Sequence, residues 1–279
     1  MTSTTTTTPV LVIGATGKIG SRVITRLEQQ GIPARGASRR SNPAFDWENQ
    51  STWAPALAGA EVAFVAFVPD IAVPGAPETI RAFAATALAA GIKRVVMLSG
   101  RGEANAQRSE QIMAGSGLGT TIVRASWFSQ NFSEGILLPE VLSGLIALPA
   151  AQYGEPFVDA DDIADVAVAA LTDISHVGEI YEVTGPRLLT FADAAAAISA
   201  ASGRDVAYAP ISLEEFHAAL EPEVGADIAE FLTRLCEEVF DGRNEKLGDG
   251  VQRALGRQPR DFADYCADTA ATGVWSQAI

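Results

Sequence analysis

The segment VLVIGATGKIGSRV, residues 10–23, constrains the fold of this chain most strongly. An apolar run ends at Gly14, two further glycines follow at Gly17 and Gly20, and a helical apolar spacing begins at once. A strand that turns into a helix through closely spaced glycines is typical of the first unit of a doubly wound α/β sheet. The motif therefore predicts a Rossmann-type parallel sheet.

The rest of the first half supports this prediction, because short apolar runs alternate with helical patterns. The run VAFVAFV, residues 62–68, is apolar throughout and fits a strand that is buried on both faces. Strands are predicted at residues 9–13, 33–38, 62–68, 94–98, 120–124 and 179–183, and helices at residues 19–30, 78–90, 109–114 and 161–172. Residues 191–202, 213–220 and 226–240 have helical patterns, so the C-terminal part is expected to be mostly helical and to pack on the sheet.

Composition excludes several classes of protein. Among 279 residues, 20 Lys and Arg face 34 Asp and Glu, and the net charge of −14 argues against nucleic-acid binding. Two histidines are too few for a multi-histidine metal site, so no metal is predicted. Cys236 and Cys266 are expected to be isolated thiols, and a disulfide between them is the alternative. No apolar run is long enough to span a membrane. The Thr-rich residues 1–8 are expected to be a disordered tail and not a signal peptide, which favours a cytoplasmic protein.

The glycine turn is a candidate phosphate site. Glycines let a pyrophosphate approach the backbone, and the following helix offers free N–H groups and a positive dipole end. A tight turn without a ligand is the alternative. Because the turn lies between a strand and a helix, dinucleotide binding is favoured, with contacts from Gly14, Thr16, Gly17, Lys18 and Ile19.

The end of the second strand distinguishes the two nicotinamide cofactors. An NAD site usually has an acidic residue there, whereas this chain has Ser38, Arg39 and Arg40. Two guanidinium groups can bind a 2′-phosphate, which favours NADP(H) over a pair of merely solvated arginines. Asp46 is a candidate for the adenine amino group, or for a turn or cap.

Two further strand ends are expected to line the cofactor. Ligands of doubly wound sheets bind at the carboxyl ends of strands. Ala66, Phe67 and Val68 are therefore expected beside the nicotinamide ribose, and Ser99 and Gly100 beside the nicotinamide.

The chain resembles the NmrA-like family of atypical short-chain dehydrogenase/reductases. The matching segments are GATGKIG, SRRS, RVVMLSG, SGLGTTIVRASWFSQNF, PFVDADDIADVAVAALT and YEVTGP. Within the family, FDWENQSTW and RASWFSQNF look most similar to the ergot-alkaloid reductases of the festuclavine and agroclavine synthase type. The resemblance implies an NAD(P)-binding domain at residues 9–132, a substrate-region segment at 133–157, returning Rossmann elements at 158–186 and a C-terminal substrate region at 187–279.

The resemblance also implies a substrate wall after the strand at residues 120–124. Its residues would be Trp127, Phe128, Gln130 and Asn131, which offer aromatic faces for flat molecules and amides for polar groups. Alternatively, the two aromatic residues belong to the core and Asn131 caps a helix.

The chain lacks the Tyr-x-x-x-Lys pair with which reductases of this superfamily usually move a proton. Three interpretations stay open. The acceptor needs little acid assistance, as an iminium, quinone or enone would; or another acid, Ser99, Glu103 or Tyr153, replaces the tyrosine; or NADP(H) binds without turnover, as in some NmrA-like regulators. The predicted function is an NADPH-dependent reductase of a small aromatic or heterocyclic molecule. The alternative is a redox sensor, which alone would require a protein partner.

Overall fold

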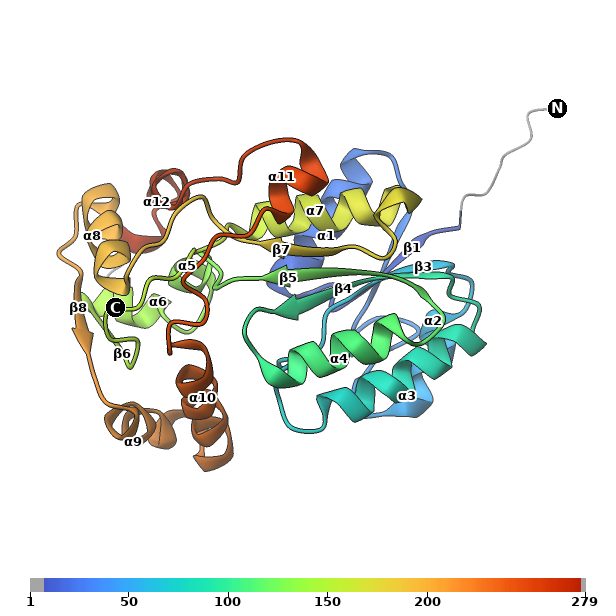
Figure 1. Cartoon of the computed structure of the whole chain (residues 1–279), viewed down its shortest axis with the longest axis horizontal. Helices are drawn as coiled ribbons and strands as arrows, with labels where there is room; N and C mark the ends of the chain where they lie inside the picture. Colours follow the sequence, from blue (N-terminus) through green and yellow to red (C-terminus); the bar gives the residue numbers. More distant parts are fainter. Residues whose placement is uncertain (1–7, 277–279) are drawn as a thin grey trace.

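The computed structural model describes residues 8–276, and its larger part is a six-stranded parallel sheet (Figure 1). Its order is β2-β1-β3-β4-β5-β7, and every neighbouring pair is parallel. The strands are β1 (Val10–Ile13), β2 (Ala34–Ala37), β3 (Val62–Val65), β4 (Arg94–Gly100), β5 (Gly119–Ala125) and β7 (Ile180–Val183). The order reverses between β1 and β3, and ligands of doubly wound sheets bind in a crevice at such a point. The predicted Rossmann-type fold is therefore confirmed.

Helices cover both faces of this sheet, which explains why its strands are almost continuously apolar. Leu11 and Ile13 of β1 point to one face, and Val10 and Val12 point to the other. The first face packs against α2 (Trp53–Leu57), α3 (Ala76–Ala89) and α4 (Ala104–Ala114), and the second against α1 (Lys18–Gln29), α7 (Ala160–Thr172) and α11 (Gly250–Leu255).

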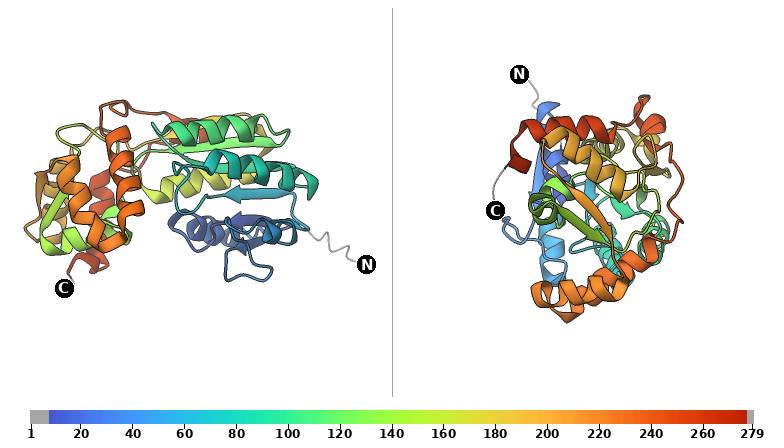
Figure 2. Two further views of the ribbon diagram at one scale, coloured as in Figure 1. Left: turned by 90° about the horizontal axis from the view of Figure 1, so that it is seen from below. Right: turned by 90° about the vertical axis from the view of Figure 1, so that its left-hand side faces the viewer.

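A smaller lobe lies beyond the carboxyl ends of the strands (Figure 2). It has its own aromatic core, in which Phe132, Phe157, Phe191 and Trp275 are almost wholly buried. Its helices are α5 (Asn131–Glu134), α6 (Leu138–Ser143), α8 (Phe191–Ser202), α9 (Leu213–Val224), α10 (Ala226–Val239) and α12 (Phe262–Ala271). Three short 3-10 helices lie elsewhere along the chain: η1 (Gln50–Thr52), η2 (Ile174–His176) and η3 (Val274–Ser276).

The structure adds two features that the sequence did not predict. A second parallel sheet pairs β6 (Leu145–Leu148) with β8 (Ala207–Pro210), in the part of the chain that was expected to be mostly helical. In addition, α11 returns to the main sheet and buries Val251 there, although residues 187–279 were all expected in the substrate region. Both features depend on contacts between distant segments, which local patterns do not encode.

Two further expectations from the sequence concern the N-terminal tail and membrane-spanning segments. Most of the predicted tail, residues 1–7, lies outside the described residues. Within residues 8–276, none of the helices has both the length and the apolar character needed to cross a membrane.

Candidate active site

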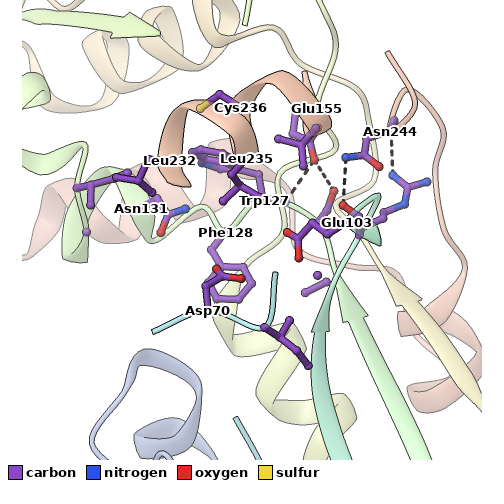
Figure 3. A pocket seen from close by; sticks show the side chains of 18 of the residues that line it. Asp70, Glu103, Trp127, Phe128, Asn131, Glu155, Leu232, Leu235, Cys236 and Asn244 are labelled. Atoms are coloured by element: carbon purple, nitrogen blue, oxygen red, sulfur yellow. Dashed lines mark hydrogen bonds between the residues drawn. The ribbon is translucent and has the colours of Figure 1, made fainter. Parts of the chain in front are cut away.

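A cavity of about 430 Å³ lies between the carboxyl ends of the sheet strands and the smaller lobe (Figure 3). Lys18 lies on the side of the glycine turn, and Ser99 and Gly100 contribute the end of β4. The lobe contributes an apolar wall, mainly from α9 and α10: Phe216, Leu232, Leu235, Cys236 and Val239. The cavity therefore joins the predicted cofactor turn to the predicted substrate region.

The glycine turn has the backbone that a phosphate site requires. Gly14 has a φ of +81°, in the left-handed region that favours glycine. A Cβ atom on Gly20 would lie 2.2 Å from the carbonyl oxygen of Gly14, so only glycine lets α1 begin so close to the turn. Thr16 and Gly17 are exposed, Ile19 is buried beneath them, and the Lys18 ammonium donates to Asn131 Oδ1 at 3.1 Å. Burial lowers the pKa of Lys18.

The turn after β2 presents two free cations. Arg39 and Arg40 are exposed, and within residues 8–276 neither side chain takes part in an ion pair. Ser38 Oγ accepts a hydrogen bond from the Arg40 N–H at 3.2 Å, which shapes the turn. Asp46 Oδ1 accepts from the Glu48 N–H at 3.1 Å, so Asp46 has the turn role that was its alternative assignment.

The end of β3 meets the glycine turn. β3 ends at Val65, and the Ala66 side chain faces Gly14, whose Cβ would lie 3.0 Å from it. Phe67 lines the cavity, whereas the Val68 side chain is 51% exposed and is not part of the lining.

Ser99 lines the cavity, but its hydroxyl group belongs to a buried polar network. Its hydroxyl donates to Glu110 Oε1 of α4 at 2.7 Å. Glu110, only 4% exposed, also pairs with Arg124, which bonds Glu182 Oε1 at 2.9 Å. Because its proton is directed into this network, Ser99 is a poor proton donor to the cavity.

Three of the four predicted wall residues line the cavity. They are Trp127, Phe128 and Asn131, which are half-buried. The Trp127 Nε1–H is shielded from solvent and has no hydrogen-bond partner among the described residues.

Gln130 does not reach the cavity, although it was expected in the wall. Its amide donates to Asp159 Oδ1 at 2.8 Å and accepts from the Ala160 N–H at 2.7 Å. Both partners are at the beginning of α7, so Gln130 fixes the beginning of that helix.

Three carboxyl groups border the cavity: Asp70, Glu103 and Glu155. The sequence offered Glu103 as a candidate acid but gave no reason to choose it. Asp70 and Glu155 were missed, although Asp70 follows a strand end as ligand-binding residues do. The exposed Tyr153 lies outside the cavity, against Gly242. Among residues 8–276, no three His, Cys, Asp or Glu side chains form a group that could hold a metal ion.

The apolar wall from α10 was also missed as part of the site. Leu232, Leu235, Cys236 and Val239 recur at helical spacing, and the sequence predicted an amphipathic helix there. The pattern shows that one face is buried, but not that the face borders a cavity. Both cysteines are free and buried, as expected, and burial raises the pKa of Cys236 to about 12.

Comparison with known proteins identifies the family of the chain. A family model described as NAD(P)H-binding matches residues 14–174, more than half of the chain. The chain therefore belongs to this NAD(P)H-binding family.

Three relatives match nearly the whole chain. It is 32% identical to the oxidoreductase YesF of Bacillus subtilis, covering 96% of this chain and 98% of that protein. It is 31% identical to an NAD(P)H azoreductase of Xenophilus azovorans, covering 94% and 98%. It is 31% identical to the agroclavine dehydrogenase of Claviceps fusiformis, covering 95% and 98%. These matches confirm the resemblance to the ergot-alkaloid reductases and the expectation of an NAD(P)H-dependent oxidoreductase.

Two solved structures share the fold. An NADPH-dependent quinone oxidoreductase of Escherichia coli in complex with NADPH superimposes with a TM-score of 0.78 at 21% identity, covering 93% of this chain and 99% of that one. NmrA, a negative transcriptional regulator in complex with NAD, superimposes with a TM-score of 0.70 at 17% identity, covering 96% and 99%.

Proposed function

We propose that the protein is an NADPH-dependent reductase of small, planar aromatic or heterocyclic acceptors. The observation that carries this proposal is the cavity of about 430 Å³ that connects the glycine turn with an aromatic and aliphatic wall. Its size lies within the range of small-molecule sites, and its lining is mostly apolar with a few polar groups. The azoreductase and the agroclavine dehydrogenase support the proposal as relatives that are named for redox reactions.

The described residues fit the cofactor. When bound, NADPH supplies a hydride. The Gly14 turn and the beginning of α1 would hold its pyrophosphate, and Lys18 would add a cation on the cavity side. Gly100, at the end of β4, lines the cavity where the nicotinamide would lie. Phe67, Trp127 and Phe128 would hold a flat acceptor and exclude water.

Arg39 and Arg40 support a preference for NADPH. They are exposed cations without ion-pair partners among residues 8–276, in a chain whose net charge is −14. No carboxylate stands beside them in the SRRS turn to hold the ribose hydroxyls of NAD. Guanidinium groups bind phosphate with charge-assisted hydrogen bonds, each of which contributes roughly 1.5–3 kcal/mol.

Incubating the pure protein with NADPH and a panel of iminium, quinone and enone acceptors tests the function. We expect NADPH oxidation with at least one acceptor class. If NADPH binds tightly and no acceptor is reduced, the reductase proposal is wrong. The redox-sensor alternative would then apply, and a pull-down that captures a regulatory protein would support it independently.

A double variant tests the cofactor preference. Arg39→Ala with Arg40→Ala is expected to weaken NADPH binding roughly 100-fold and to leave NADH binding almost unchanged. Arg35→Ala is the matched control, because the Arg35 guanidinium bonds the Ala58 carbonyl at 2.9 Å. Equal loss of affinity for both cofactors in the double variant would contradict the preference.

A further inference from the structure

Glu103 has an unusual position at the end of β4. It follows Gly100 by three residues, and its carboxyl group lies against that glycine. A Cβ atom on Gly100 would be 2.0 Å from Glu103 Oε2 and 2.4 Å from Oε1. The carboxyl group therefore occupies the space that a side chain at position 100 would fill. In Figure 3 it points into the cavity, on the side of Phe128 and Asp70.

The Glu103 carboxyl group also lacks the hydrogen bond that an N-cap side chain usually accepts from the first turn of its helix. Glu103 is the N-cap residue of α4, yet its side chain does not cap the helix. Glu238 of α10 takes that role instead and accepts from the Ala104 N–H at 2.7 Å. Glu103 Oε2 is shielded from solvent, and nothing within residues 8–276 donates a hydrogen bond to it.

The other two cavity acids are held in place. Asp70 Oδ1 accepts from the Ala72 N–H at 2.8 Å. Glu155 Oε1 accepts from Ser126 Oγ at 2.7 Å and from the Trp127 N–H at 3.3 Å. Of the three acids, Glu103 alone combines an unpaired carboxyl with a position beside Gly100, where the nicotinamide is expected.

We propose that Glu103 is the acid that donates a proton to neutral acceptors in this protein, in place of the absent tyrosine. The proposal rests on the proposed reductase function. It replaces the open choice among Ser99, Glu103 and Tyr153 with one residue, because Ser99 donates to Glu110 and Tyr153 lies outside the cavity.

The surroundings of Glu103 favour its protonated form. Burial, followed by the nearby carboxylates, raises its pKa well above the usual range of glutamate. Two arginines near Glu103 are engaged by other groups: Arg101 pairs with Glu182 at 3.4 Å, and Arg243 donates to the Gly102 carbonyl and pairs with Asp241 and Glu238. Lys18, which also lines the cavity, donates to Asn131 Oδ1 at 3.1 Å. The acidic groups that face Glu103 are Asp70, Glu110, Glu155 and Glu238.

The reaction balances with one proton from this residue. The acceptor takes a hydrogen with two electrons from NADPH, which leaves as NADP⁺. In a quinone, the hydride forms a C–H bond at a carbonyl carbon, the electron pair of that C=O bond moves to the oxygen, and the oxygen forms an O–H bond with the proton that Glu103 releases. The resulting carboxylate regains a proton from solvent. A cationic acceptor becomes neutral when it takes the hydride and needs no proton.

This difference provides a test with two planar three-ring acceptors. Phenanthrenequinone is neutral and needs a proton, whereas N-methylacridinium is a cation and needs none. General acid catalysis contributes roughly 100-fold to 10,000-fold. Under anaerobic conditions, Glu103→Gln is expected to lower kcat for the quinone at least roughly 100-fold and to change kcat for acridinium less than about threefold.

The pH profile and two further variants sharpen the test. The wild-type quinone rate is expected to fall as pH rises through the pKa of Glu103. Glu103→Asp should retain this fall at a reduced rate, and Glu103→Gln should abolish it. Glu140→Gln is the matched control, because Glu140 is also a partly buried carboxyl with a raised pKa but is not part of the cavity lining. Its quinone profile should be unchanged.

Infrared spectroscopy tests the protonation of Glu103 without relying on turnover. Infrared difference spectra of the protein, recorded against pH, should contain a protonated-carboxyl band that Glu103→Gln removes and Glu140→Gln retains. NADPH affinity should be the same in both variants. Equal effects of Glu103→Gln on both acceptors, or no effect on either, would overturn the proposal for Glu103. If the wild type reduces neither acceptor nor any other acceptor of the panel, the reductase function itself fails.

Discussion

Gly20→Ala tests whether the close contact between α1 and the glycine turn is needed for cofactor binding. Gly20 is buried in the first turn of α1. A Cβ atom there would lie 2.2 Å from the Gly14 carbonyl oxygen, 2.7 Å from its carbon and 3.0 Å from Ala15 Cα. All three atoms belong to the backbone, so no side-chain rotation can relieve the overlap.

Two effects of opposite sign determine how much Gly20→Ala changes the stability of the fold. Alanine is a better helix former than glycine by about 1 kcal/mol, which alone would stabilise the variant. A carbon and an oxygen in contact are normally about 3.3 Å apart, so the turn and the helix must separate by about 1 Å. Overpacking of this kind costs about 1–3 kcal/mol in stability. Because the displaced atoms are those that would hold the pyrophosphate, we expect NADPH binding to weaken by about 2 kcal/mol, or roughly thirtyfold.

Thermal unfolding and NADPH fluorescence titration measure the two effects. We expect a Tm lowered by a few degrees and a Kd for NADPH raised roughly thirtyfold. Thr25→Ala, at an exposed site of the same helix, is the control and should leave both quantities nearly unchanged. If Gly20→Ala raises the Tm and leaves the Kd unaltered, helix propensity outweighs the contact and the argument from backbone overlap is wrong.

Two further predictions concern buried charges. Arg124→Met leaves the buried Glu110 without its ion-pair partner, so the free energy of unfolding measured with urea should fall by about 3 kcal/mol; a loss below about 0.5 kcal/mol would contradict this. Because the folded chain holds the Glu103 proton at pH values where the unfolded chain has lost it, this group stabilises the fold less as pH rises above the usual glutamate range. The Tm of Glu103→Gln relative to wild type should therefore increase from about pH 4 to pH 8, and a constant difference would show that Glu103 has an ordinary pKa.

The glycine turn and the continuous apolar runs are local features, and the sequence alone determined what they form. A strand buried on both faces must be apolar throughout, and a turn that packs a helix onto a backbone carbonyl must use glycine. The fold class, the family and the NAD(P)H cofactor could therefore be predicted, and so could the place of Trp127 in the cavity wall.

Only the tertiary structure decided which polar groups are free to act. Ser99, Gln130 and Glu103 are all polar residues near strand ends in the sequence. Ser99 and Gln130 bond to α4 and to the beginning of α7, whereas Glu103 is released from capping because Glu238 of α10, far along the chain, takes its place. Whether a side chain is satisfied depends on partners brought by distant segments, and the sequence around a residue carries no record of them.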